Sequence, residues 1–413
     1  MDNVYVIGVG MTPFGRYLDK KIRDLAGEAI TEAIQDARIS RELVQAVWFS
    51  NSGWGYFDNQ HCIRGQVALR HLGFAGLPIV NVENACASGS TAFHSAWTAV
   101  KAGLYDCVLA VGAEKVYNTD REKMFKGFFT GVDVENIEVH FNMLSDIKRR
   151  VNFTVPAQSE EEAGKSKSAF MDIYASMCHW HMGRFGSTQE QLAVISSKNH
   201  FHGSLNPKAQ IRKKMTVEKV LAERLIAWPL TLPMCAPVGD GAAAAILCSE
   251  NFLKKLDKAR AVKIRASVLG TGTDRDLDEP DIGFRVSRKA YEMAGVEPKD
   301  INLAEVHDAS AYGELHQTEV LGFCPEGEGG IFAESGATIL GGKMPVNTSG
   351  GLESRGHPIG ASGLAQIYEL VTQLRGEAGE RQVHGARLAL AENGGGNIGY
   401  EEAAMCVHIL EKV

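Results

Sequence analysis

Apolar positions along the chain form two series that follow the same order in its first and second halves. Each series opens with an apolar run, at residues 3–9 and 262–270, and continues with a helical stripe and a further apolar run. The series match at a constant spacing of 257 residues, in the pairs Ala37 and Ala294, Ile39 and Val296, Val44 and Ile301, Val47 and Ala304, and Phe49 and Val306. The match indicates an internal duplication, although two unrelated α/β units would share part of the pattern.

The duplication continues into the rest of each half. The matching segments are small-residue turns at 86–89 and 360–363, helices at 92–102 and 364–375, and strands at 107–114 and 387–395. The order strand, helix, strand, turn, helix, strand is typical of a mostly parallel sheet with helices on its faces. We therefore expect an α/β protein in which duplicated α/β/α halves form a five-layered α/β/α/β/α body with two central helices.

The pattern breaks between the halves, which sets the expected domain boundaries. We expect a first half at 1–117 that is completed by 236–260, an inserted lid subdomain at 118–235, and a second half at 261–413. Ser187-Thr188-Gln189-Glu190 within the insertion has capping-box spacing before an apolar run, which predicts a helix start. An insertion of this length is typical of a segment that covers an active site.

Composition narrows the class of protein. Hydrophobic residues make up 45% of the 413 residues, as in a globular protein, and no apolar run is long enough to span a membrane. The net charge of −7 predicts no general attraction to nucleic acid. The first residues lack the basic segment of a signal peptide, and the eight cysteines are scattered. A cytoplasmic protein with reduced thiols is expected.

Cys86 is the first candidate for chemistry. The segment VENACASGS at 82–90 ends a strand and begins a helix, so the Cys86 thiol should face the partly positive helix N-terminus. That position is expected to lower its pKa and favour the thiolate. The alternative is that Cys86 is a buried packing residue, as most free cysteines are.

His357 occupies the matching place in the second half, within SGGLESRGHPIGASG at 349–363. The pseudo-twofold relation should bring it close to Cys86, and a Cys–His pair is the usual way to activate a sulfur nucleophile. His307 and Asp308 end a strand of the second half, at the edge where ligands bind in such sheets.

Two other motifs have weaker implications. The glycines of ENGGGNIG at 392–399 allow backbone N–H groups to point at an oxyanion. Cys178, His179 and His181 stand too close together, without a second ligand pair, to form a tetrahedral zinc site. We therefore expect no metal site.

Four segments together carry a resemblance to the thiolase superfamily over essentially the whole chain. They are NACASGS around Cys86, MCAPVGDGAAAAI at 234–246, GHPIGASG around His357, and the C-terminal GGGNIG. VHDAS at 306–310 and LGFCPEGEGG at 321–330 more narrowly resemble the sterol-carrier-protein-type thiolases and their bacterial and archaeal relatives. The resemblance implies the thiolase fold and an acyltransferase with coenzyme A as co-substrate and no permanently bound cofactor.

The resemblance also implies roles for individual residues. His357 takes the proton of Cys86, whose thiolate attacks the 3-oxo carbon of a 3-oxoacyl-CoA, and the reverse reaction is a Claisen condensation. His307 and His357 polarise the thioester oxygen, the former through a water molecule. The N–H groups of Cys86 and Gly394 hold the oxyanion, and the turn at Ser349 and Gly350 is expected to contact substrate or oxyanion.

The sequence departs from the family where a second cysteine normally protonates the enolate. The two positions that carry this cysteine hold Glu392 and Ala309. We expect His307 or Glu392 to act as acid and base instead.

The leading interpretation is a thiolase for a bulky or aromatic acyl-CoA, such as 2-benzoylsuccinyl-CoA. The resemblance implies a homodimer, and the likeness to relatives with a small zinc-ribbon and OB-fold partner adds the hypothesis of such a partner for this chain. A retro-aldol lyase, a condensing subunit of the acetoacetyl-CoA or acylphloroglucinol type, and a non-catalytic scaffold subunit are the alternatives. The retained Cys86 favours thiolysis or condensation, because related retro-aldol enzymes lack this cysteine.

Overall fold

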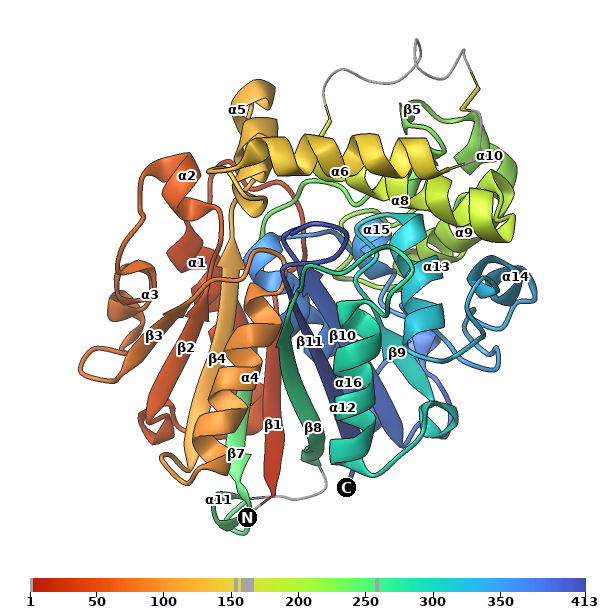
Figure 1. Cartoon of the computed structure of the whole chain (residues 1–413). Helices are drawn as coiled ribbons and strands as arrows, with labels where there is room; N and C mark the ends of the chain where they lie inside the picture. The colour runs from red at the N-terminus through yellow and green to blue at the C-terminus, as the bar shows by residue number, and fades with distance from the viewer. Residues whose placement is uncertain (1–2, 152–154, 157–166, 257–259) are drawn as a thin grey trace.

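One large sheet runs through the computed structural model, which describes residues 3–151, 155–156, 167–256 and 260–413 (Figure 1). Within these residues its strand order is β3-β2-β4-β7-β1-β8-β11-β10-β9. The strands are β1 Val4–Met11, β2 Ala46–Ser50, β3 Ile79–Val82, β4 Cys107–Glu114, β7 Gly241–Ser249, β8 Val262–Thr271, β9 Leu303–Glu305, β10 Leu388–Gly395 and β11 Ala404–Lys412. The order β2-β4-β7-β1 is repeated as β9-β10-β11-β8, so the duplication predicted from the sequence is confirmed.

Helices sort into the expected layers around the two half-sheets. α1 (Ile22–Ala37) covers the outer face of the first half, and α12 (Ile282–Ala294) covers that of the second. α4 (Ser88–Lys101) and α16 (Ser362–Arg375) pack against each other between the half-sheets, and their apolar residues share one core cluster. The five-layered arrangement is thereby confirmed. The alanine-rich α4 is buried inside the chain.

The prediction that the sheet is mostly parallel is wrong. Three of the eight strand pairs described in the large sheet are parallel, β2 with β3, β2 with β4, and β9 with β10, and the other five are antiparallel. The strand that completes each half, β7 or β11, runs against its neighbours. β7 enters from the inserted segment and β11 from a short loop after β10, so neither needs a crossover helix.

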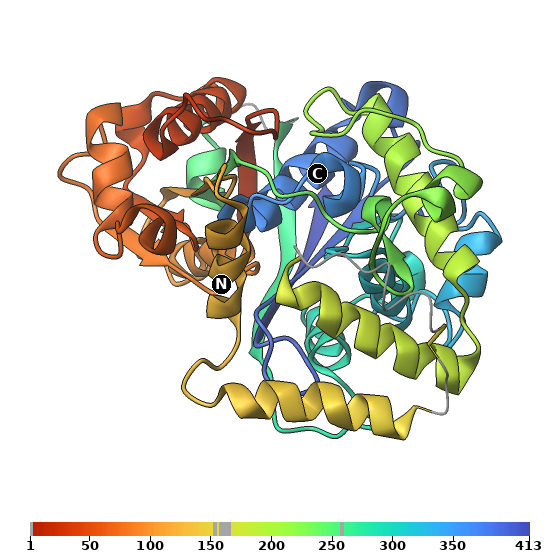
Figure 2. The same cartoon turned by 90° about the horizontal axis from the view of Figure 1, so that it is seen from above.

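The inserted segment is mainly helical. Its described α-helices and strands are α5 Arg121–Gly127, α6 Ile137–Arg150, α8 Ala169–Phe185, α9 Gln189–Leu205, α10 Val217–Ala222, β5 Leu225–Ala227 and β6 Leu230–Thr231. Figures 1 and 2 show α6 and α8 lying across one end of the sheet. Thr188 is the N-cap residue of α9, and its side chain forms a capping box with Gln191, one residue beyond the predicted Ser187–Glu190 box.

The remaining helices connect and cover these layers. They are α2 Trp54–Asp58, α3 Arg64–Leu69, α11 Glu250–Leu253, α13 Ala311–Val320, α14 Gly329–Glu334 and α15 Gly351–Arg355. None of the helices in the described part of the chain combines the length and apolar character needed to cross a membrane.

Candidate active site

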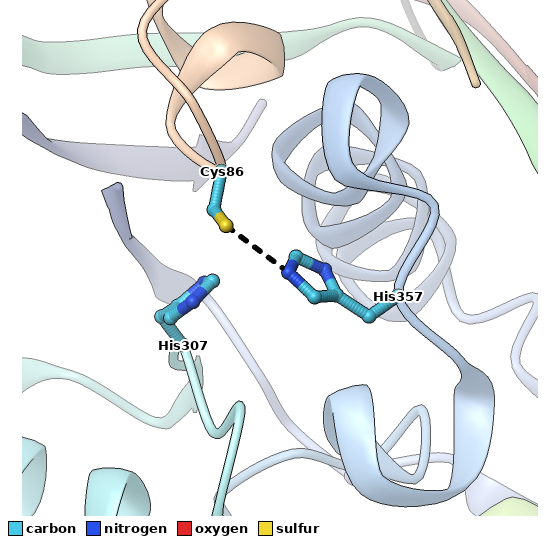
Figure 3. Close-up of side chains that lie close together, drawn as sticks. All are labelled: Cys86, His307 and His357. Carbon is cyan, nitrogen blue, oxygen red and sulfur yellow. Dashed lines mark hydrogen bonds between the residues drawn. The ribbon is translucent and has the colours of Figure 1, made fainter. Parts of the chain in front are cut away.

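Cys86, His307 and His357 lie close together (Figure 3), in a cavity that residues of the inserted segment also line. One ligand atom from each lies within 4.8 Å of the other two. Cys86 precedes α4, His307 follows β9, and His357 lies between α15 and α16. Their convergence follows from the duplication, because the small-residue turns that begin α4 and α16 face each other across the central layer.

A sharp turn presents the Cys86 side chain. Ala85 has a left-handed φ of 47°, which is unusual for a residue with a Cβ atom and stores backbone strain. Ser88 holds the turn on both sides: its hydroxyl accepts from the Asn84 N–H at 2.9 Å and donates to the Ala85 carbonyl at 2.6 Å. The thiol is thereby fixed at the start of α4.

His357 is oriented to accept a proton from Cys86. Its Nε2 lies 3.2 Å from the Cys86 Sγ, and its Nδ1 lies 2.7 Å from the Ser362 Oγ. Ser362 donates its hydroxyl hydrogen to the Pro358 carbonyl at 3.0 Å, so the oxygen accepts from Nδ1–H. These two hydrogen bonds leave the Nε2 lone pair facing the thiol, as a general base requires.

Burial keeps this pair uncharged. Burial, together with the carboxylates of Glu83 and Glu114, raises the pKa of the Cys86 thiol to about 12. Burial also lowers the pKa of His357 well below its ordinary value. The expectation of a lowered Cys86 pKa is wrong, because desolvation of the sulfur outweighs the backbone amides of Cys86 and Gly396, which act in the opposite direction.

His307 is held by the strand that carries the glycine motif. Its backbone N–H donates to Glu392 Oε2 at 2.8 Å, and its Nδ1 accepts from the Asn393 side-chain amide at 3.0 Å. The ring proton therefore sits on Nε2. Burial lowers the pKa of His307 to about 3, so the ring is a neutral hydrogen-bond donor.

The residues at the two positions where similar sequences carry a second cysteine differ in their access to the cavity. Ala309, Gly394 and His307 line the cavity, whereas Glu392 is fully buried behind His307. Burial raises the pKa of Glu392 to about 8.

Ser349 and Gly350 lie beneath the cavity, and neither lines it in the described part of the chain. The Ser349 N–H donates to Glu305 at 3.0 Å, and its hydroxyl bonds the same carboxylate. Gly350, with a φ of 100°, packs against Gly203 in α9. Asp308 points into the same interior and accepts from the Leu352 N–H at 2.7 Å. These residues join the loops that hold His307 and His357.

The cavity above the three residues has a volume of about 650 Å³. Its aromatic residues come mainly from the inserted segment: Tyr117, Phe125, Phe128, Phe170 and Tyr174. Its basic residues are Arg16, Arg121, Lys167, Lys213 and Arg224. Gly396, from the predicted glycine motif, also lines it, as does Glu402, which the sequence analysis did not identify. Both residues lie in the loop between β10 and β11, and it is the fold that places this loop beside the cavity.

Cys178, His179 and His181 do not converge on one point. The His179 Nε2 contacts the Trp228 carbonyl at 2.7 Å, and the His181 Nε2 lies 3.0 Å from Glu319. Among the described residues, the one grouping of three metal-ligating side chains is Cys86 with His307 and His357, where the sulfur already contacts His357.

Family comparison gives matches over both halves. Residues 4–251 match the profile described as "Thiolase, N-terminal domain", and residues 276–412 match "Thiolase C-terminal domain-like". The acetyl-CoA acetyltransferase of Methanothermobacter thermautotrophicus is 38% identical over 417 residues, covering 100% of each chain. Sterol carrier protein 2 of Bos taurus is 40% identical over 95% of this chain and 70% of its own.

A third relative, benzoylsuccinyl-CoA thiolase subunit BbsB of Thauera aromatica, is 35% identical over 95% of this chain and 94% of its own. Among solved structures, the one titled "Ltp2-ChsH2(DUF35) aldolase" superposes with a TM-score of 0.77 at 22% identity. It covers 100% of this chain and 98% of that chain. At this identity the likeness concerns the fold alone.

Proposed function

The chain belongs to the thiolase family, and we propose that it carries an acyl group on Cys86 while it cleaves or forms a carbon–carbon bond. It is an acyltransferase with coenzyme A as co-substrate, working by thiolytic cleavage of a 3-oxoacyl-CoA or by the reverse condensation. The observation that carries the Cys86 assignment is the 3.2 Å contact between the Cys86 thiol and the correctly oriented His357 Nε2.

His357 acts as the base of the first step. As the Cys86 sulfur attacks the 3-oxo carbon, its proton moves to the His357 Nε2, so no free thiolate needs to accumulate in the buried site. Cleavage of the bond between C2 and C3 then leaves an acyl group on Cys86 and releases a thioester enolate. Coenzyme A takes the acyl group, and Cys86 regains its proton from His357.

Backbone amides and His307 stabilise the charges that develop on oxygen. The Cys86 amide, with that of Gly394 or of Gly396 two residues further on, donates to the oxyanion at the acyl carbon. The neutral His307 donates from Nε2 to the thioester oxygen, and His357 contacts the same oxygen. The buried Ser349 and Gly350 support these loops from below.

We propose a bulky or aromatic acyl group, such as that of 2-benzoylsuccinyl-CoA, as the substrate. The aromatic residues of the cavity suit a large planar acyl group, and one relative is named a benzoylsuccinyl-CoA thiolase subunit. The basic residues of the cavity suit the phosphates of coenzyme A.

We also propose assembly into a homodimer that recruits a small zinc-ribbon/OB-fold subunit, in the cytoplasm. β3 is an edge strand of the sheet, with Val80 and Asn81 exposed, so it can pair with a second copy. The word "subunit" in the name of the Thauera relative supports a partner. All eight cysteines are free thiols, as suits a reducing compartment.

The test is mass spectrometry of the Cys86 peptide after incubation with a panel of acyl-CoAs that includes acetyl-CoA and phenylacetyl-CoA. An adduct on Cys86 that coenzyme A removes is expected. Cys86→Ala should abolish adduct and turnover, while Cys62→Ala, which changes an exposed cysteine, should leave both unchanged. Turnover of Cys86→Ala within tenfold of wild type contradicts the proposal. An aldehyde or ketone product without an adduct identifies a retro-aldol lyase.

A further inference from the structure

A carboxyl group lines the cavity beside the glycine motif. Within the described residues, the cavity contains two carboxyl side chains, Glu223 and Glu402. Glu223 is exposed at the end of α10, whereas Glu402 is half-buried and lies against Gly394. A Cβ atom placed on Gly394 would lie 3.0 Å from the Glu402 Cγ and 3.5 Å from its Cδ. The Glu402 carboxyl is therefore beside the backbone assigned to the oxyanion.

The loop between β10 and β11 fixes this position. Glu401 is buried and anchored by Arg275 and Arg285 at 3.3 and 2.8 Å. Ala403 closes the loop by donating its N–H to the Gly396 carbonyl at 3.4 Å. The two arginines thus hold the loop in place through Glu401, and the adjacent Glu402 side chain lines the cavity.

Glu402 has the chemistry of a proton carrier. It forms no ion pair within the described part of the chain, and burial raises its pKa above that of an ordinary glutamate. It also lies near the hydroxyl of Tyr174, whose pKa burial and the Glu402 charge raise. A carboxyl group in such surroundings can be protonated in one step and ionised in the next.

The other three groups near this position, Glu392, His307 and Cys235, are less suited to carry a proton to and from the substrate. Glu392 is enclosed behind His307, without access to the cavity, and accepts the His307 N–H. His307 is a neutral donor that protonates only in strong acid. Cys235 lines the cavity next to Ala309, but burial raises its pKa, and its thiol points to the Thr231 carbonyl at 3.5 Å.

We infer that Glu402 is the catalytic acid and base at the substrate α-carbon, in place of the family's second cysteine. This inference rests on the proposed thiolase reaction. In cleavage, the Glu402 carboxylic acid gives its proton to C2 of the enolate and becomes a carboxylate. The carboxylate then takes the proton of the coenzyme A thiol as its sulfur attacks acyl-Cys86. In condensation the same transfers run in reverse, so Glu402 returns to its starting state after each turnover.

The experiment compares two half-reactions in the same enzyme preparation. Exchange of the α-protons of acetyl-CoA and phenylacetyl-CoA with D₂O is followed by NMR, and formation of acyl-Cys86 from the same thioesters by mass spectrometry. Glu402→Gln should slow exchange about 100-fold or more, the usual contribution of a general acid–base group, while acylation stays within about tenfold. Glu402→Asp should restore part of the exchange, and Glu380→Gln, at an exposed glutamate, should match wild type.

Three outcomes overturn the inference: unchanged exchange in Glu402→Gln, equal loss of exchange and acylation, or loss of exchange in Cys235→Ala instead. A failure of the proposed function is distinguishable, because wild-type enzyme would then form no acyl-Cys86 at all.

Discussion

At the level of single residues, the reactive pair is governed by burial. The Cys86 thiol and the His357 imidazole are both desolvated, so each favours its neutral form. The pair therefore differs from a thiolate–imidazolium pair, in which the sulfur is charged before substrate arrives. In the proposed mechanism, proton transfer is therefore coupled to attack, and the Ser362 hydroxyl supports it by fixing which ring nitrogen carries the proton.

The lowered His357 pKa predicts activity that persists in mild acid. A base is active while unprotonated, so activity is lost as pH falls through its pKa in the folded enzyme. A histidine with an ordinary pKa of about 6.5 would be only about one-quarter unprotonated at pH 6. We expect acylation of Cys86 at pH 6 to proceed within about twofold of its rate at pH 7.5.

Stopped-flow measurement of acylation between pH 5 and 8 provides the check. A midpoint of activity near pH 6.5 would show that His357 titrates normally and would contradict the account of burial given above.

At the level of elements, the site depends on very close packing between β4 and the loop that begins α16. A Cβ atom on Gly112 would lie 2.1 Å from the Gly360 carbonyl oxygen, which also accepts from the Ser50 hydroxyl at 2.6 Å. Since real Cβ atoms do not approach backbone so closely, this contact requires glycine. The same loop continues from His357 to Ser362, so its position sets the geometry of the base.

Gly112→Ala should therefore lower stability and slow acylation together. Overpacking of this kind costs about 1–3 kcal/mol, measurable as a lower urea midpoint with an unchanged slope. Gly15→Ala is the control, because its added Cβ would meet only Tyr17 at an ordinary 3.5 Å. Equal urea midpoints for the two variants would show that the β4 contact is easily relieved.

At the level of the whole molecule, the sheet ends in an open edge at β3. An exposed strand edge can form hydrogen bonds with a strand of another chain. An isologous contact between two β3 strands would give a closed dimer. Such pairing would bring the Cys86 turns of two subunits toward the shared interface, because each turn follows β3 directly.

Light scattering of the isolated chain should therefore give twice the chain mass of 44.8 kDa. Val80→Glu should shift the mass toward a monomer, because it places like charges across the pair. Co-expression with genomic neighbours should add a small subunit and raise activity. An isolated, fully active dimer that recruits no neighbour would refute the partner subunit, and a monomer would refute the dimer.

The sequence by itself determined the duplicated architecture, the layers, and the placement of Cys86 and His357 at matching turns. These features depend on local patterns, namely apolar periodicity and small residues at strand–helix turns, and a local pattern is visible without coordinates. The motifs shared with the thiolase family indicated the expected reaction, because they contain Cys86, His357 and the glycine-rich turn.

Tertiary structure alone decided the direction of β7 and β11, the charge state of Cys86, the burial of Ser349, Gly350 and Glu392, and the access of Glu402 to the cavity. Strand direction depends on where the chain re-enters the sheet, and a pKa depends on how much water the surrounding atoms exclude. Strand direction and pKa therefore both depend on residues that lie far apart in the sequence. Which of two glutamates near the glycine motif lines the cavity is therefore a property of the folded chain.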